Sequence, residues 1–174
     1  TREALIELSE AFSQSAFTFF ATDSVFLVNP TAFAEQIAQR HYLDALVREA
    51  EDVPNEIVKV MVLERNRQVI KQIQKRSQSL TAELAYSMPY SYEINPAGIN
   101  KANTLVKLLQ IMKLEDFPIY VVGDAENDLS LFELAKRSFA PSSAHFSLLE
   151  RADQVIHRED RGLLAPILEE IGLA

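Results

Sequence analysis

The residues with the clearest chemical potential stand in the run from Val121 to Asp128, which reads Val-Val-Gly-Asp-Ala-Glu-Asn-Asp. An apolar strand that ends in Gly-Asp and passes into a helix places polar groups beyond the strand's carboxyl end, where ligands bind in open α/β sheets. Asp124, Asp128 and the amide of Asn127 offer hard oxygen donors, a set that suits Mg²⁺. The same residues also fit an ordinary strand-to-helix turn, in which acidic side chains cap the helix and favour its positive end.

Lys101 is the second residue of interest, because it follows the predicted helix cap Asn100 and lies in the first turn of that helix. A cation at this position opposes the helix dipole by about 0.3–1 kcal/mol. A bound anion would explain the charge, since helix N-termini hold phosphate groups; a solvated surface lysine is the alternative. Lys101 and Asp124 both open helices of successive β-α units, so we expect them at the same rim of the sheet.

The hydrophobic pattern around these residues predicts a parallel sheet covered by helices. From residue 92 onward, short apolar strands alternate with helices, and Ile119 to Val122 is wholly apolar, as is typical of a strand buried on both faces. The predicted strands are 92–94, 119–122, 138–140 and 154–156, and the predicted helices are the one capped by Asn100 and 126–136, 145–151 and 163–171.

Residues 1–91 follow a different pattern, typical of a small α/β layer with a mostly antiparallel sheet. All four glycines of the chain lie after residue 97. This uneven distribution also indicates that the two parts differ in structure. The predicted elements are a helix over 2–13, a hairpin of strands 16–20 and 25–28, a long helix after Asn29-Pro30 with apolar residues as far as Val47 available for packing, a strand over 57–63, a basic helix over 66–77 and a strand over 80–87.

Three segments resemble those of the Cof-type haloacid dehalogenase (HAD) superfamily phosphatases. Residues 92–101 are similar to the family's E-I-x-P-x-G-x-x-K segment, and residues 122–129 to its G-D-x-x-N-D metal motif. Residues 153–156 followed by 160–163 resemble its tail, although Arg161 interrupts the D-G-V turn expected there. The resemblance implies that residues 92–174 form the C-terminal portion of a Rossmann-like HAD core and that residues 1–91 form an α/β cap domain.

The resemblance also implies Mg²⁺-dependent hydrolysis of phosphate esters through an aspartyl-phosphate intermediate. Carried onto this chain, Lys101 is expected to pair with the phosphoryl oxygens and to steady the nucleophile. Asp124 is expected to bind Mg²⁺, Asp128 to bind the metal or orient its waters, and Asn127 to reach the phosphate. Small phosphorylated metabolites, sugar phosphates above all, are the expected substrates.

One part of the family's pattern has no counterpart here. The family nucleophile lies in an Asp-x-Asp pair after the first core strand, and this sequence contains no Asp-x-Asp. We therefore expect the chain to comprise the cap and the closing part of the core, to need an N-terminal core segment of the same protein as its partner, and to be inactive by itself. The alternative is a non-catalytic binding or regulatory module that retains the HAD fold.

Composition narrows the expected partners. With 17 basic and 25 acidic side chains the formal net charge is −8, so we expect no nucleic-acid partner. No apolar run approaches the about 18 residues of a membrane helix, so we expect no membrane partner either. The chain has no cysteine, which fits the reducing cytoplasm, the expected location.

Overall fold

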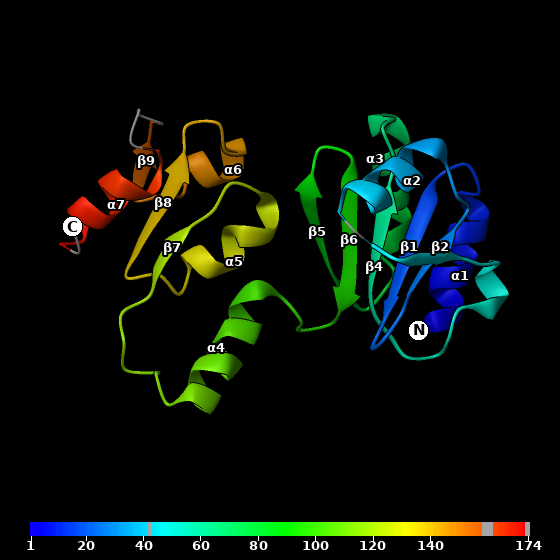
Figure 1. Cartoon of the computed structure of the whole chain (residues 1–174), viewed down its shortest axis with the longest axis horizontal. Helices are drawn as coiled ribbons and strands as arrows, with labels where there is room; N and C mark the ends of the chain where they lie inside the picture. Colours follow the sequence, from blue (N-terminus) through cyan, green and yellow to red (C-terminus); the bar gives the residue numbers. More distant parts are fainter. Residues whose placement is uncertain (42, 158–161, 173–174) are drawn as a thin grey trace. The chain divides into compact units, whose positions relative to one another are not determined.

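The computed structural model describes residues 1–41, 43–157 and 162–172. The chain divides into two compact units, Thr1–Ile99 and Asn100–Ala174, each with its own sheet and helices (Figure 1). The division between the compact units therefore lies after Ile99. The sequence had indicated a division after residue 91. The reason is that the strand over 91–96, predicted to open the second part, pairs with two strands of the first sheet.

The first unit is built on a six-stranded sheet with the order β3-β2-β1-β4-β6-β5. Neighbouring strands are antiparallel except β2 and β3, which confirms the expected mostly antiparallel sheet. The elements are α1 (Arg2–Ala11), β1 (Ala16–Ala21), β2 (Val25–Val28), α2 (Ala32–Arg40), β3 (Ala45–Val47), the 3-10 helix η1 (Ala50–Asp52), β4 (Ile57–Leu63), α3 (Arg67–Ser77), β5 (Ala82–Met88) and β6 (Ser91–Pro96).

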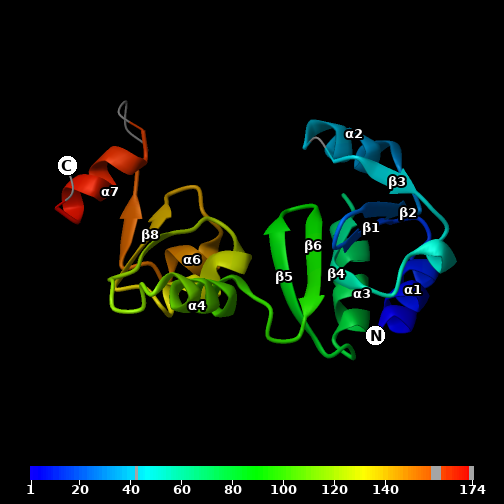
Figure 2. The ribbon, with the colours of Figure 1, turned by 60° about the horizontal axis from the view of Figure 1, so that its bottom comes forward.

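Strand alternation gives this sheet one strongly apolar face. Phe17, Phe19, Val60, Val62 and Tyr92 lie on that face and are almost wholly buried, packed with residues of α1 and α3. Each of the phenylalanine and valine side chains among them contributes about 1.5–3 kcal/mol relative to an exposed one. The helix α2 packs on the opposite face, and Figure 2 shows it across the sheet from α1 and α3.

The helix after Asn29-Pro30 is shorter than the sequence indicated. Its N-cap is Thr31, whose hydroxyl accepts a hydrogen bond from the Ala34 amide at 3.1 Å, and the helix ends at Arg40. The last residues expected to extend it, Ala45–Val47, form β3, which pairs in parallel with β2. Leu46 and Val47 remain 41% and 50% exposed. Short apolar runs fit a helix or an edge strand equally well, and here the free edge of β2 supplies the backbone partners.

The second unit holds a three-stranded sheet with the order β7-β8-β9, and both strand pairs are parallel. The parallel sheet with flanking helices predicted from the sequence is thus present. The elements are α4 (Lys101–Met112), β7 (Tyr120–Val122), the 3-10 helix η2 (Glu126–Asp128), α5 (Leu129–Phe132), β8 (Arg137–Pro141), α6 (Phe146–Leu149), β9 (Gln154–Ile156) and α7 (Leu164–Glu170).

Two features of this unit differ from the sequence-based expectation. The helix predicted over 126–136 is a 3-10 turn followed by the four-residue α5. The strand β7 is not buried on both faces, because Val121 is buried whereas Val122 is 42% exposed. None of the helices in the described part of the chain combines the length and the apolar character needed to cross a bilayer.

Candidate active site

The loop that follows β7 is held close to its own downstream turn. The amide of Gly123 donates to the Phe139 carbonyl of β8 at 3.1 Å, which fixes the start of the loop. A Cβ at Gly123 would lie 2.6 Å from the Cβ of Asp128 and 3.0 Å from a ring carbon of Phe132. The group that approaches this glycine is the side chain of Asp128.

Asp128 is the organising residue of this loop. Its Oδ2 accepts hydrogen bonds from the backbone amides of Asp124 at 3.1 Å and Ala125 at 3.3 Å. Its Oδ1 accepts from Nζ of Lys101, with which it also forms an ion pair. The side chain is only 10% exposed. A carboxylate removed from water to this extent needs such partners, because burial of an unpaired charge is costly.

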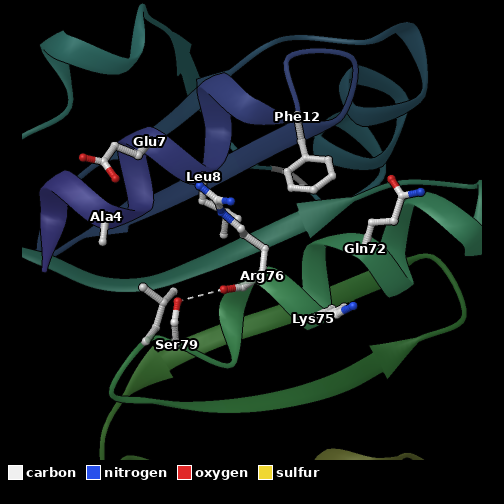
Figure 3. Close-up of a pocket in the computed structure, with 9 residues that line it drawn as sticks. Ala4, Glu7, Leu8, Phe12, Gln72, Lys75, Arg76 and Ser79 are labelled. Atoms are coloured by element: carbon white, nitrogen blue, oxygen red, sulfur yellow. Dashed lines mark hydrogen bonds between the residues drawn. The ribbon is translucent and has the colours of Figure 1, made fainter.

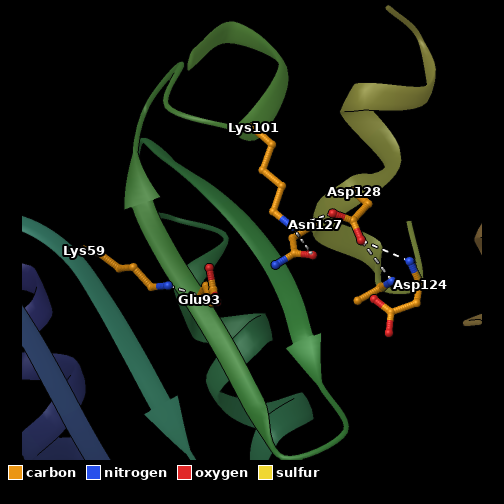
Figure 4. A network of polar contacts seen from close by, with 7 residues as sticks. Lys59, Glu93, Lys101, Asp124, Asn127 and Asp128 are labelled. Atoms are coloured by element: carbon orange, nitrogen blue, oxygen red, sulfur yellow. Dashed lines mark hydrogen bonds and ion pairs between the residues drawn. The ribbon is translucent and has the colours of Figure 1, made fainter. Parts of the chain in front are cut away.

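Lys101 reaches this loop from the first residue of α4. The side chain of Asn100 caps the helix by accepting from the Asn103 amide at 2.9 Å, as the sequence predicted for Asn100. The ammonium group of Lys101 contacts Asp128 and also donates to Oδ1 of Asn127 at 3.3 Å (Figure 4). The Asp128 carboxylate therefore balances a cation that the helix dipole disfavours, and Lys101 is not an isolated surface lysine.

Asp124 differs from Asp128 in having a free carboxylate. Its backbone is fixed on both sides, because its amide donates to Asp128 and its carbonyl accepts from the His145 amide at 2.8 Å. Its side chain is exposed, and within the described ranges no hydrogen bond or ion pair engages its carboxylate oxygens. The loop therefore presents Asp124 to solvent from a rigid backbone.

His145 was not among the predicted site residues, although it tethers the Asp124 loop. Its ring Nδ1 lies 2.8 Å from Oγ of Ser147 and 3.7 Å from Oε1 of Glu126. The only sequence signal for this contact is that His145 follows β8, so both loops leave the same edge of a parallel sheet.

The donor set fits Mg²⁺ in part. Mg²⁺ commonly binds one or two protein carboxylates, and waters and substrate phosphates complete its octahedron. Asp124 is free to act as such a ligand, whereas both oxygens of Asp128 are engaged by Lys101 and the backbone. In the part of the chain that the structure describes, no cluster of three or more His, Cys, Asp or Glu residues suits a metal. The Asp124 carboxylate is thus available to a cation, whereas the Asp128 carboxylate holds the loop.

The described part of the tail segment, which includes residues 153–156, has a structural role. Oδ2 of Asp153 accepts hydrogen bonds from the amide and the hydroxyl of Ser138, at 2.7 and 2.8 Å. These hydrogen bonds lower the pKa of the Asp153 carboxyl. Asp160 and Arg161, which belong to the same sequence resemblance, lie outside the described residues.

Comparison with solved structures shows the same fold in several hydrolases. A HAD subclass IIB sugar phosphatase matches with a TM-score of 0.84 and 16% identity, over 99% of this chain and 66% of the other. A haloacid dehalogenase-like hydrolase from B. subtilis matches with a TM-score of 0.79 and 17% identity, over 98% of this chain and 70% of that one. At these identities the likeness concerns the fold alone.

Curated relatives match over shorter stretches. A 5-amino-6-(5-phospho-D-ribitylamino)uracil phosphatase of Bacillus subtilis is 35% identical over 79 residues, which are 45% of this chain and 28% of that protein. A phosphoglycolate phosphatase of Nitrosopumilus maritimus is 32% identical over 89 residues, 47% of this chain and 38% of that protein. The matches thus span well under two thirds of these relatives.

The family model for haloacid dehalogenase-like hydrolases matches residues 1–167, nearly the whole chain. This match covers both units, whereas the three segments noted in the sequence cover only residues after 91. The chain belongs to the haloacid dehalogenase-like hydrolase family.

Proposed function

We propose that this chain is part of a Mg²⁺-dependent phosphatase that hydrolyses small phosphorylated metabolites, sugar phosphates above all, through an aspartyl-phosphate intermediate. The observation that carries the proposal is the contact of the Lys101 ammonium group with Asp128 and Asn127, on the loop that presents the free carboxylate of Asp124. A cation, an amide and a free carboxylate at one strand end are the groups that phosphoryl transfer needs. The relatives named as phosphatases support the same substrate class.

Each residue of the site then has a distinct task. Lys101 and Asn127 offer an ammonium group and an amide to the phosphoryl oxygens. Asp128 holds the Lys101 amine and the Asp124 backbone in place before substrate arrives, so that little reorganisation is needed during the reaction. Asp124 would hold Mg²⁺, which when bound neutralises phosphate charge and aligns the phosphoryl group with the nucleophile.

We infer that the nucleophile comes from a segment outside these 174 residues, since the chain contains no Asp-x-Asp. Two features of the second unit support this inference. In the described residues β7 pairs only with β8, so its other edge is open. Apolar side chains of α4 also remain exposed, with Leu108 at 49% and Ile111 at 80%. A parallel strand beside β7 would end at the same edge as Asp124 and would bring its acidic residue there.

We further propose that the first unit is the cap that selects the substrate. Nζ of Lys59 lies 3.0 Å from Oε1 of Glu93 and 5.6 Å from the ring centre of Phe20 (Figure 4 shows the ion pair). An ion pair beside an aromatic ring offers a donor, an acceptor and apolar surface, the groups that orient small polar ligands. A Lys59→Met variant of the chain extended upstream of Thr1 tests this role, because it should change KM among sugar phosphates with little effect on kcat.

The test of the activity is hydrolysis of p-nitrophenyl phosphate by the chain extended upstream of Thr1 with its native coding sequence. We expect Mg²⁺-dependent turnover by the extended protein and none by the 174-residue chain. Asp124→Ala should abolish the activity, and Lys101→Ala should reduce kcat by about 10²–10³-fold, as loss of one charge-stabilising group does elsewhere. Lys107→Ala is the matched control, because Lys107 is an exposed lysine of the same helix and lies outside the site.

An extended protein that is folded, supplied with Mg²⁺ and still inactive on a panel of phosphate esters would contradict the proposal. That result would favour the second interpretation, a non-catalytic binding module that retains the HAD fold.

A further inference from the structure

A groove lies between α1 and α3 of the first unit and shares no residue with the candidate active site. Its volume is about 600 Å³. Ala4, Leu8 and Phe12 from the N-terminal segment and Leu80, which follows α3, supply its apolar lining. Figure 3 shows Leu8 and Phe12 among the side chains that line it.

The two walls of the groove carry opposite charge. The α1 wall contributes Glu7, and the α3 wall contributes Lys75 and Arg76 together with Gln72. Glu7, Lys75 and Arg76 are all exposed. None of the three takes part in an ion pair with another described residue. Their charges are therefore available to a molecule that covers the groove.

The charge of α3 stands out against the rest of the chain. The helix carries Arg67, Lys71, Lys75 and Arg76 and no acidic residue, whereas the whole chain has a formal net charge of −8. Two copies of the chain therefore repel each other at long range over most of their surfaces. The α3 face is a place where an acidic surface of a second copy is attracted instead.

We propose that the α1–α3 groove is the interface between two copies of this chain, related by a two-fold axis that runs along the groove. In such a contact each surface patch meets itself, and this axis sets α1 of one copy against α3 of the other. Glu7 then faces Lys75 and Arg76 of the second copy, twice per dimer, and the two apolar linings cover each other.

A uniformly acidic partner fits the groove less well than a second copy. It would attract Lys75 and Arg76 but would meet Glu7 on the opposite wall, where like charges repel. A second copy matches the charges of both walls at once.

The test is the oligomeric state of the 174-residue chain by sedimentation velocity, with two charge-reversal variants. The wild-type chain should be a dimer. Glu7→Lys should weaken the dimer by at least about tenfold in Kd, and so should Lys75→Glu combined with Arg76→Glu, because each sets like charges against each other. An equimolar mixture of the two variants should dimerise again, since the introduced lysine meets the introduced glutamates and the original Glu7 meets the original Lys75 and Arg76.

Controls separate this interface from other modes of association. Glu56→Lys and Arg48→Glu change the same charges at exposed positions outside the groove and should leave the dimer intact. Where a charge reversal impairs folding by circular dichroism, Glu7→Cys mixed with Lys75→Cys replaces it. The chain has no cysteine, so every cross-link reports the introduced pair.

Three results would overturn the proposal: a monomeric wild-type chain, a dimer that survives both groove variants, or variants that stay monomeric when mixed. The second result would assign association to a different surface, such as the exposed apolar residues of α4.

Discussion

Asp128 links two segments of the site that are distant in the sequence, because one oxygen binds Lys101 and the other binds the amides of residues 124 and 125. The neighbouring Asp124 makes no such side-chain contacts within the described ranges, although both are aspartates of the same short motif. At the scale of single residues, the motif therefore contains one structural and one available carboxylate.

Replacing each of these aspartates by asparagine should separate the two roles. Asp128→Asn removes the charge that Lys101 and the two amides share, so it should destabilise the second unit by about 1.5–3 kcal/mol, the range for hydrogen bonds to charged groups. Asp124→Asn should change stability by no more than about 0.5 kcal/mol, as for other exposed positions. Urea unfolding followed by circular dichroism measures both, and equal effects would contradict the division of roles.

Gly123 has no side chain, and this leaves room for the side chain of Asp128. In Gly123→Ala the added methyl group would stand 2.6 Å from the Asp128 Cβ, so the loop must shift. We expect a loss of about 1–3 kcal/mol in stability, typical of overpacking. In the proposed extended protein kcat should fall as well. An alanine variant with wild-type stability and activity would show that the loop does not hold this conformation.

At the scale of elements, Asp153 ties the loop before β9 to the start of β8 through the amide and hydroxyl of Ser138. These two hydrogen bonds favour the charged carboxylate, which is why its pKa in the folded protein is below the ordinary value of 3.8. One ionised side chain therefore joins the loop before β9 to the start of β8.

The stability that Asp153 contributes to the folded protein should decrease as the pH is lowered. Because the folded-state pKa is lowered, the contribution is present above the ordinary value and is lost as pH falls below about 4 toward the folded-state pKa. Asp153→Asn should therefore be less stable than the wild type near about pH 7, and the difference should shrink in acid. Urea midpoints across this range measure it, and a difference that does not vary with pH would disprove the role.

The end of α2 illustrates why element types were easier to predict than element lengths. Leu46 and Val47 continue a helical spacing, yet they lie in β3 beside β2. Likewise the helix predicted over 126–136 gives way to a 3-10 turn, in which Asp128 folds back on the loop. Local periodicity did not distinguish these outcomes: backbone pairing with β2 decided the first, and hydrogen bonds between the Asp128 side chain and its own loop accompany the second.

At the scale of the whole molecule, the open edge of β7 and the exposed apolar residues of α4 are the surfaces where the proposed nucleophile segment would dock. Hydrogen exchange measured by mass spectrometry tests this docking independently of activity. In the extended protein, amides of Tyr120–Val122 should exchange more slowly than in the 174-residue chain, since a new strand would bond them. Exchange in α3 serves as the control and should not change. Equal exchange of β7 in both proteins would place the segment elsewhere.

The α/β class, the mostly antiparallel first sheet, the parallel second sheet and the likeness to HAD phosphatases could all be predicted from the amino-acid sequence. These follow from hydrophobic periodicity and short motifs, which are properties of neighbouring residues. Only the tertiary structure decided that the first unit extends to Ile99, that Asp128 binds Lys101 across 27 positions of sequence, and that Glu7 and Arg76 line one groove. Contacts of this kind depend on how distant segments pack, because a side chain's partners are set by the folded backbone and not by its sequence neighbours.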